Sequence, residues 1–322
     1  MNAVELKKNG GPEVLEIIEK ETPAPGSDQL LIKQKAIGIN FIDIYQRNGL
    51  YPVDLPFTPG FEGSGIIEKA GYGVEDFIPG ERVAYAAAAK TYAEYTVVDT
   101  ENAVKIPDKL SFESAAALML QGMTAHYLAK STYHISENDR VLIHAGAGGV
   151  GRLLIQLAKS AGAEVFTTVS TKEKSQIAAA CGADHVILYT MKDFRAEIER
   201  IAGKRALSVV YDSVGKATFL NSMACLRPRG YLVSFGQSSG KVDPVDPGLL
   251  SSSGSLFLTR PTLFHYIADR ESLVNRAGEM FQLLLEKKIS LLIGETFPLS
   301  KVREAQSLLE SRKSVGKILL IP

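Results

Sequence analysis

Apolar and polar residues alternate along much of the first third of the chain. Residues 28–36 (DQLLIKQKA) show this pattern, and residues 63–69 and 82–84 are expected to form similar strands. Alternation of this kind is typical of strands that bury one face. Residues 111–130 are expected to be helical, because a serine that can cap a helix precedes a run of alanines and leucines.

From residue 139 the pattern changes to short apolar runs that alternate with segments of helical spacing. Strands are expected at 140–144, 163–169, 184–189, 207–211 and 231–235, and helices at 149–161, 173–180, 194–202 and 218–226. This strand–helix alternation predicts a doubly wound parallel sheet with helices on both faces. Residues 255–259 could add a sixth strand at its edge.

The tail combines helices expected at 270–287 and 301–311 with a last strand at 317–321. Its mixed character is closer to that of the first third than to the middle. The fold class is therefore α/β, with one domain inserted into another. We expect a doubly wound domain over residues 124–264 and a β-rich domain over residues 1–123 and 265–322.

Composition narrows the class of protein. The 322 residues include 36 Lys and Arg and 36 Asp and Glu, and 45% are hydrophobic. Such a chain can build cores, and its zero net charge disfavours nucleic-acid binding as the main role. Neither a transmembrane run nor a signal peptide is apparent, so a cytoplasmic location is expected. Cys181 and Cys225 are too few and too far apart for a structural zinc site, and no metal is expected.

A glycine-rich hexamer, Gly146-Ala147-Gly148-Gly149-Val150-Gly151, follows the expected strand at 140–144 and opens a helix. In that context G-x-G-x-x-G predicts a Rossmann-type dinucleotide site. The glycines permit close approach of a pyrophosphate, and the helix N-terminus offers free N–H groups and a positive dipole end. The alternative is a simple strand-to-helix turn.

The next strand end indicates which dinucleotide binds. An NAD site places an acid there for the ribose hydroxyls, but this strand ends in Ser170-Thr171-Lys172-Glu173-Lys174. Its hydroxyls and lysines suit a 2′-phosphate, which favours NADPH. Glu173 is the contrary residue, although it begins a helix and could complement the helix dipole. Alternatively, the lysines are ordinary solvent-exposed residues at a helix start and do not bind a phosphate.

Several stretches resemble the zinc-free quinone oxidoreductases of the medium-chain dehydrogenase/reductase superfamily, a group related to zeta-crystallin. They are AIGINFID at 36–43, RNGLYP at 47–52, HAGAGGVG at 144–151, YDSVG at 211–215, SFGQSSG at 234–240, GSLFLTRP at 254–261, ESR at 310–312 and LLIP at 319–322. The resemblance implies a GroES-like catalytic domain and NADPH-dependent reduction of a quinone in an interdomain cleft. It also implies a homodimer, often formed through the edge strand at 255–259.

Zinc alcohol dehydrogenases of the same superfamily provide a contrast. Where they typically place a cysteine and a histidine ligand, this chain has Asn40 and Phe61. Phenylalanine cannot bind a metal, and the loop with four cysteines is absent. Alcohol oxidation through a zinc alkoxide then loses its basis, whereas a quinone can accept hydride without a Lewis acid.

The resemblance also assigns residues to the cofactor, together with the glycine motif and the strand end described above. The candidates are Phe41, Ile42, Asp43, Thr124, Gly146, Gly148, Gly149, Val150, Ser170, Thr171, Lys174, Tyr189, Ser213, Phe235, Gly236, Gln237, Ser238, Leu258, Thr259 and Arg312. The segment 40–43 is expected on the nicotinamide side. Asp43 is interpreted as a structural residue or a ribose contact rather than a proton donor.

Three residues are candidates for the substrate: Asn40, Tyr45 and Tyr51. Asn40 can donate a hydrogen bond to a quinone oxygen as negative charge develops there. Each tyrosine could donate similarly or pack against the ring, and ordinary domain packing is the alternative for both.

Other functions remain open at this stage. The same scaffold could reduce an activated C=C bond in an enal or enone. A crystallin-like or RNA-binding protein without enzymatic activity is the remote alternative, and the absence of a basic stripe argues against RNA.

Overall fold

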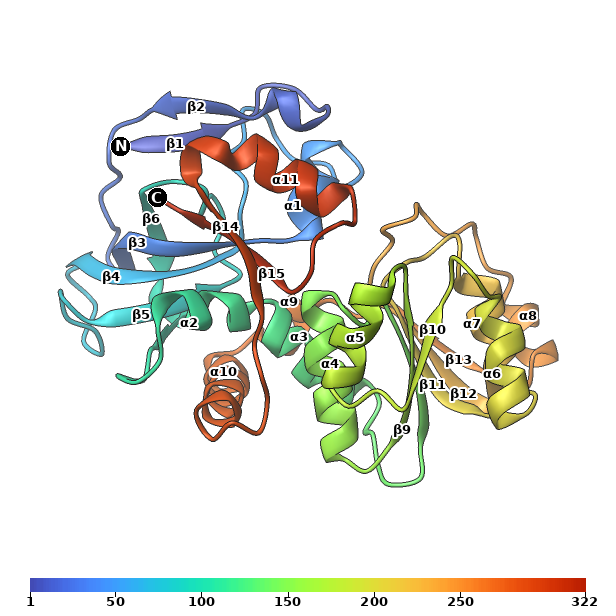
Figure 1. Cartoon of the computed structure of the whole chain (residues 1–322). Coiled ribbons are helices and arrows are strands. Elements are labelled where there is room, and N and C mark those ends of the chain that lie inside the picture. Colours follow the sequence, from blue (N-terminus) through green and yellow to red (C-terminus); the bar gives the residue numbers. More distant parts are fainter. The chain divides into compact units, whose positions relative to one another are not determined.

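A computed structural model describes the whole chain, Met1–Pro322, as two compact units (Figure 1). Unit 1 comprises Met1–Met123 and Ile267–Pro322, and unit 2 comprises Thr124–Tyr266. The middle of the chain thus forms a unit of its own between two segments of unit 1. The second boundary falls at Ile267 rather than at 265.

Unit 2 contains a six-stranded parallel sheet in the order β10-β9-β8-β11-β12-β13. Its strands are β8 (Arg140–His144), β9 (Glu164–Val169), β10 (His185–Leu188), β11 (Leu207–Asp212), β12 (Leu226–Ser234) and β13 (Phe257–Thr259). The predicted doubly wound sheet is confirmed, including the sixth strand at its edge. Strand β12 begins earlier than expected, directly after the preceding helix.

The helices of unit 2 cover both faces of this sheet. They are α3 (Gln121–Tyr127, which starts in unit 1), the π-helix η3 (Leu128–Thr132), α4 (Gly149–Ser160), α5 (Lys172–Ala180), α6 (Phe194–Ala202), α7 (Phe219–Cys225), α8 (Pro247–Ser252) and α9 (Leu263–Tyr266). Helices α4 and α5 lie on one side and α6 and α7 on the other (Figure 1). Buried Leu142, Phe166, Val210 and Leu232 form the centre of one core.

Unit 1 is β-rich, as predicted. Its strands are β1 (Asn2–Glu5), β2 (Glu16–Glu19), β3 (Gln29–Ile39), β4 (Glu62–Ala70), β5 (Arg82–Ala86), β6 (Tyr95–Asp99), β7 (Ala103–Lys105), β14 (Ile293–Pro298) and β15 (Lys317–Ile321). The main sheet has the order β14-β15-β3-β4-β5-β7, with β6 also paired to β3, and β1 and β2 form a separate pair. The C-terminal strand β15 therefore lies directly beside β3, antiparallel to it.

Helical segments complete unit 1: α1 (Phe41–Arg47), α2 (Phe112–Met119), α10 (Arg270–Leu285), α11 (Val302–Glu310), and the short turns η1 (Pro12–Val14), η2 (Thr100–Asn102) and η4 (Leu299–Lys301). The helix expected at 111–130 is broken into α2, α3 and η3. Helix α1 was not anticipated. No helix combines the length and apolarity needed to cross a membrane.

Candidate active site

One group of candidate site residues is in unit 1, where β3 ends and α1 begins. Asn40 is the N-cap residue of α1, and its backbone N–H donates to Asp43 Oδ2 at 2.7 Å. A side-chain acceptor three residues into a helix satisfies a donor that the helix itself cannot. The resulting turn fixes the position of Asn40, whose side chain is buried (5% exposed).

Both ends of the Asn40 carboxamide are engaged. Its Nδ2 donates to Glu62 Oε1 at 2.7 Å, and its Oδ1 accepts from Lys317 Nζ at 2.9 Å. Lys317 Nζ also donates to the Ile39 carbonyl at 3.1 Å and forms an ion pair with Glu62. Glu62 and Lys317 are fully buried, so this ion pair is shielded from water in the interior of unit 1.

Glu62 reaches this position because β3 leaves room for it. A Cβ atom at Gly38 would collide with the Glu62 carboxylate. The second carboxylate oxygen, Oε2, accepts from the Leu120 backbone N–H at 2.6 Å. Partners on several segments thus satisfy the buried carboxylate, as a charge removed from water requires.

A second buried carboxylate lies on α1. Asp43 is fully buried, and its Oδ2 also accepts from the Tyr92 hydroxyl at 2.7 Å, while Oδ1 has no hydrogen-bond partner. Burial raises the pKa of Asp43 from 3.8 to about 7, against the lowering effect of its hydrogen bonds and of Lys317. Burial likewise raises the pKa of Tyr92, with the neighbouring Asp43 charge acting in the same direction. Asp43 therefore has the internal contacts of a structural residue.

The two candidate tyrosines belong to one aromatic group. The rings of Tyr45 and Tyr51 make an edge contact with centroids 5.2 Å apart, and Phe41 and Tyr45 are 6.0 Å apart. Tyr51 N–H also donates to the Tyr45 carbonyl at 2.9 Å. Tyr45 is buried and Tyr51 half-buried. Packing of the two rings against each other is therefore one role of both side chains.

A second group of candidate site residues forms the glycine-rich turn of unit 2, between β8 and α4. A Cβ atom at Gly146 would collide with the Thr167 hydroxyl, and one at Gly151 with the Ala145 carbonyl oxygen. Gly148 is the N-cap of α4 and supplies no side chain to cap it. The first N–H groups of a helix lack partners within it and carry its positive dipole end. This turn therefore fits a dinucleotide pyrophosphate.

The residues expected to bind a 2′-phosphate come together at the ends of β9 and β10. Thr171 is the N-cap of α5 and accepts from Lys174 N–H at 3.3 Å, while the Ser170 carbonyl accepts from Thr190 Oγ1 at 3.0 Å. Partial burial lowers the pKa of Lys174. Hydrogen bonds at the helix start lower the pKa of exposed Glu173, which agrees with its interpretation as a helix-start residue.

A buried polar network supports the same edge of the sheet. His144 lies 2.8 Å from Thr168 Oγ1 and 3.0 Å from Ser222 Oγ, and Ser222 donates to Asp212 Oδ2 at 3.2 Å. Burial lowers the pKa of His144, despite the nearby Asp212 charge. Asp212 Oδ1 accepts from Val214 N–H at 2.8 Å. Strands β8, β9 and β11 are thereby linked where cofactor contacts are expected.

The predicted site residues divide between the two units. Unit 1 holds Asn40, Phe41, Ile42, Asp43, Tyr45, Tyr51 and Arg312, and unit 2 holds Thr124, Gly146, Gly148, Gly149, Val150, Ser170, Thr171, Lys174, Tyr189, Ser213, Phe235, Gly236, Gln237, Ser238, Leu258 and Thr259. The latter follow β8 to β12 or lie on β13 or α3, and Arg312 follows α11.

Sequence reasoning missed three partners of this site: Glu62, Tyr92 and Lys317. Glu62 directly follows Phe61, whose position in the sequence bears on metal binding alone. Lys317 had a weak signal, because it is a charged residue at the start of an otherwise apolar strand. Only the pairing of β15 with β3 reveals what that charge contacts.

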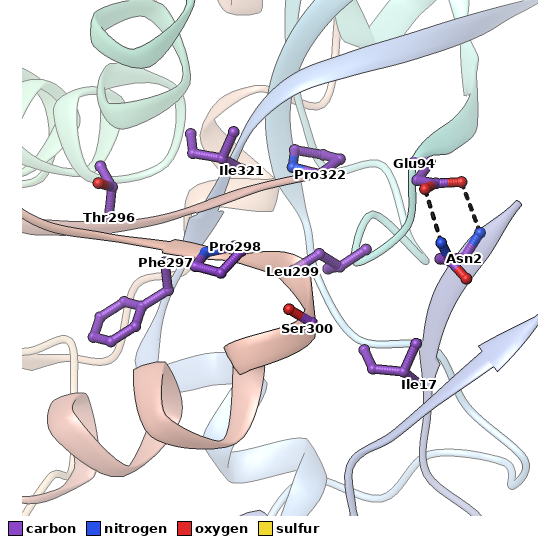
Figure 2. Close-up of a pocket in the computed structure, with 10 residues that line it drawn as sticks. All are labelled: Asn2, Ile17, Glu94, Thr296, Phe297, Pro298, Leu299, Ser300, Ile321 and Pro322. Atoms are coloured by element: carbon purple, nitrogen blue, oxygen red, sulfur yellow. Dashed lines mark hydrogen bonds between the residues drawn. The ribbon is translucent and has the colours of Figure 1, made fainter.

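A separate cavity of about 570 Å³ lies elsewhere in unit 1 (Figure 2). It is lined by Asn2, Ile17, Glu94, Thr296, Phe297, Pro298, Leu299, Ser300, Ile321 and Pro322. Figure 2 shows Glu94 held by two hydrogen bonds from Asn2, at 2.8 and 2.9 Å. At the rise of a strand, Ile321 is about 13 Å along β15 from Lys317. The cavity is therefore distinct from the Asn40 cluster.

A parallel sheet with a glycine-rich turn, joined in one chain to a β-rich unit with a buried polar cluster, defines the class of two-domain dehydrogenases and reductases. Residues 26–108 match the alcohol dehydrogenase GroES-like domain, and residues 149–285 match the zinc-binding dehydrogenase family. The chain is 43% identical to quinone oxidoreductase 1 of Escherichia coli (strain K12), over 99% of both chains. It belongs to the quinone oxidoreductase family of the medium-chain dehydrogenase/reductase superfamily.

Solved structures agree with this assignment. A crystal structure of Escherichia coli quinone oxidoreductase in complex with NADPH has a TM-score of 0.97 and 42% identity, with all of both chains covered. A 2-haloacrylate reductase from Burkholderia sp is 37% identical, over 99% of this chain and 98% of its own length. Full-length similarity thus extends to reductases of two kinds of substrate.

The zinc named in the matching family does not fit the residues present here. No group of three or more His, Cys, Asp or Glu side chains is arranged to hold a metal ion. Phe61 offers no ligating atom, and Asn40 and Glu62 already bind the Lys317 ammonium. Cys181 and Cys225 are buried in unit 2. The donors that zinc prefers, thiolate and imidazole, are missing from this cluster.

Proposed function

We propose that this protein is an NADPH-dependent quinone reductase that works without a metal ion. The observation that carries the proposal is full-length similarity to a quinone oxidoreductase solved with NADPH. When bound, NADPH supplies a hydride. The protein has to bind the cofactor, orient the acceptor and stabilise the charge that develops on its oxygen.

The turn at 146–151 would bind the pyrophosphate through its backbone, because its glycines leave no side chain in the way. Ser170, Thr171 and Lys174 would bind the 2′-phosphate and select NADPH over NADH. Half-buried Lys174 is a suitable cation for this, because a phosphate would offset the desolvation that lowers its pKa.

Asn40 would act on the substrate side. Its Nδ2 carries two hydrogens, and Glu62 accepts one of them. The other can donate to a quinone oxygen as negative charge develops there. Tyr45 and Tyr51, whose rings are in contact, would pack against an aromatic acceptor, and their hydroxyls could add hydrogen bonds.

Reduction of an activated C=C bond is the second candidate, favoured by the similarity to a 2-haloacrylate reductase. A single assay separates the two. Purified protein is mixed with NADPH and either a para-quinone, an enone or 2-chloroacrylate, and the loss of nicotinamide absorbance is followed. We expect fast oxidation with the quinone. Turnover of the enone or haloacrylate alone would contradict the quinone assignment and establish the alternative.

A homodimer is part of the same proposal. Strand β13 pairs only with β12 in the sheet, and Phe257 on it is 49% exposed while its ring stacks on Tyr231 at 4.5 Å. An uncovered apolar edge strand invites pairing with a second copy. Light scattering should give twice the chain mass of 34.8 kDa, and a monomeric mass would contradict the dimer.

A further inference from the structure

A fully buried lysine and glutamate bind the two ends of the Asn40 carboxamide. Lys317 offers three ammonium hydrogens, and three acceptors meet them: the Ile39 carbonyl at 3.1 Å, Asn40 Oδ1 at 2.9 Å and the Glu62 carboxylate. Its donor capacity is thus filled. Four segments meet here, since the cluster joins β15, the end of β3, the start of α1 and the start of β4.

This arrangement determines the orientation of the Asn40 side-chain amide, that is, which partner its oxygen faces and which its nitrogen faces. The oxygen and nitrogen of a carboxamide are similar in shape, and only their partners tell them apart. Lys317 can only donate, and an ionised Glu62 can only accept. Asn40 Oδ1 must therefore face Lys317, and Nδ2 must face Glu62. A flipped amide would place its nitrogen against the ammonium and its oxygen against the carboxylate.

We propose that Lys317 and Glu62 are positioning residues that hold the Asn40 amide as a hydrogen-bond donor toward the substrate oxygen. The inference rests on the proposed function, in which Asn40 contacts the substrate. A flipped Asn40 would offer its oxygen, which cannot donate to a carbonyl. The ammonium also draws electron density toward Asn40 Oδ1, which strengthens the donor at Nδ2.

The ion pair places a positive charge beside Asn40 Oδ1 and a negative charge beside Asn40 Nδ2, and both charged side chains are fully buried. Removing only one partner would leave an uncompensated buried charge and destabilise the fold. The test therefore removes both charges together, with Lys317→Met and Glu62→Gln in one protein.

The test is a double-mutant cycle that compares wild type with three variants: Asn40→Ala, the pair K317M/E62Q, and the combined triple variant. If Lys317 and Glu62 act through Asn40, the pair should lower kcat with a para-quinone about 10-fold to 100-fold. The dissociation constant for NADPH should stay within about twofold. The triple variant should be no slower than Asn40→Ala, because non-additivity marks groups that act as a unit.

Tyr85→Phe is the matched control. Tyr85 is fully buried in the same unit, and its hydroxyl donates to Gln34 rather than to Asn40, Glu62 or Lys317. Loss of the Tyr85 hydroxyl should lower the melting temperature of the protein while leaving kcat within about twofold of the wild-type value. Equal losses of kcat in this control and in the pair would mean a general effect of instability, and would overturn the positioning role.

A second readout needs no turnover. In ¹H–¹⁵N spectra of the full chain, the Asn40 side-chain amide is identified by its loss in Asn40→Ala. Its hydrogen exchange should become at least about 10-fold faster in K317M/E62Q, because buried hydrogen bonds protect amides. Unchanged exchange would overturn the inference.

The outcomes also separate this inference from the function on which it rests. If wild-type protein reduces no quinone, the proposed function is contradicted, and the role of Asn40 in it is contradicted as well. If wild type is active but the triple variant multiplies the losses of the other two, Lys317 and Glu62 act independently of Asn40. That result would overturn the positioning role alone.

Discussion

In unit 2 the candidate cofactor contacts lie on single strand-to-helix turns, whereas in unit 1 the candidate substrate group depends on distant segments. The turn at 146–151 is made of backbone from consecutive residues. Asn40 is held by Glu62, 22 residues away, and by Lys317, 277 residues away. The turn in unit 2 can form from consecutive residues alone. The Asn40 cluster in unit 1 can form only when the strands that carry Glu62 and Lys317 have paired in the sheet.

The two regions also handle charge differently. Unit 2 places its candidate cation, Lys174, only partly buried beside a helix start. Unit 1 buries two carboxylates and one ammonium together: Asp43, Glu62 and Lys317. Substitutions should therefore affect ligand binding in unit 2, and mainly folding, pH dependence and turnover in unit 1. Four substitutions test this difference.

The largest effect should come from Asp43 in unit 1. Its pKa is raised from 3.8 to about 7 by burial, so the folded state binds its proton more tightly than the unfolded state. The contribution of Asp43 to the free energy of unfolding should therefore be greatest below pH 4 and should fall as the pH rises to about 7. The loss is on the order of 4 kcal/mol, from the size of the shift.

Asp43→Asn should remove that slope, measured as the difference between variant and wild type in urea unfolding from pH 4 to pH 8. Asp269→Asn is the control, because exposed Asp269 caps α10 and hydrogen bonds lower its pKa. It should leave the stability change between pH 5 and 8 as in wild type. A parallel pH profile for Asp43→Asn and wild type would disprove the burial effect.

The next largest effect should come from Gly151→Ala in unit 2. The new Cβ atom would collide with the Ala145 carbonyl oxygen, a backbone atom that cannot easily move. The dissociation constant for NADPH, measured by fluorescence titration, should rise on the order of 100-fold. Retention of tight binding with an intact thermal transition would show that the cofactor does not use this turn.

A smaller effect is expected for Lys174→Ala. Loss of its charge should weaken NADPH binding about 10-fold and leave NADH binding unchanged, since only NADPH carries the 2′-phosphate. Lys159→Ala is the control, because Lys159 lies in the last turn of α4 and forms an ion pair with Asp184 at 2.7 Å. Equal losses for the two cofactors would place Lys174 outside the 2′-phosphate site.

The smallest effect is a gain. Gly278 lies within α10, and a Cβ atom there would meet nothing within 4 Å. Gly278→Ala should stabilise the protein by about 0.5–1 kcal/mol through helix propensity alone. Comparison with Gly151→Ala then distinguishes a glycine that the cofactor turn requires from a helix glycine that can be replaced by alanine. A lower melting temperature would show that the helix surface is less open than described.

Much of the fold could be predicted from the sequence, because unit 2 follows local rules. Apolar runs and helical spacing identified five of its six strands, and the edge strand β13 was expected as well. The glycine motif was predictable for the same reason, since strand, turn and helix are consecutive. The boundaries of β12 were less predictable, because this strand begins without any turn residue after α7.

The unit 1 site could be predicted only in part. Asn40 was identified through the family resemblance, but its partners were not. Glu62 and Lys317 acquire their roles from the antiparallel pairing of β4 and β15 with β3. Helix α1 is short, and its start depends on the Asp43 contact rather than on a periodic apolar face. Sequence periodicity carries no information about contacts of this kind.

We propose that hydride transfer to a quinone proceeds here with Asn40 and its buried ion pair, and without a metal. The direct measurement is the rate of NADPH oxidation with a para-quinone before and after exhaustive metal removal, followed by addition of zinc. We expect the same rate in all three samples. A rate that is lost on metal removal and restored by zinc would contradict it.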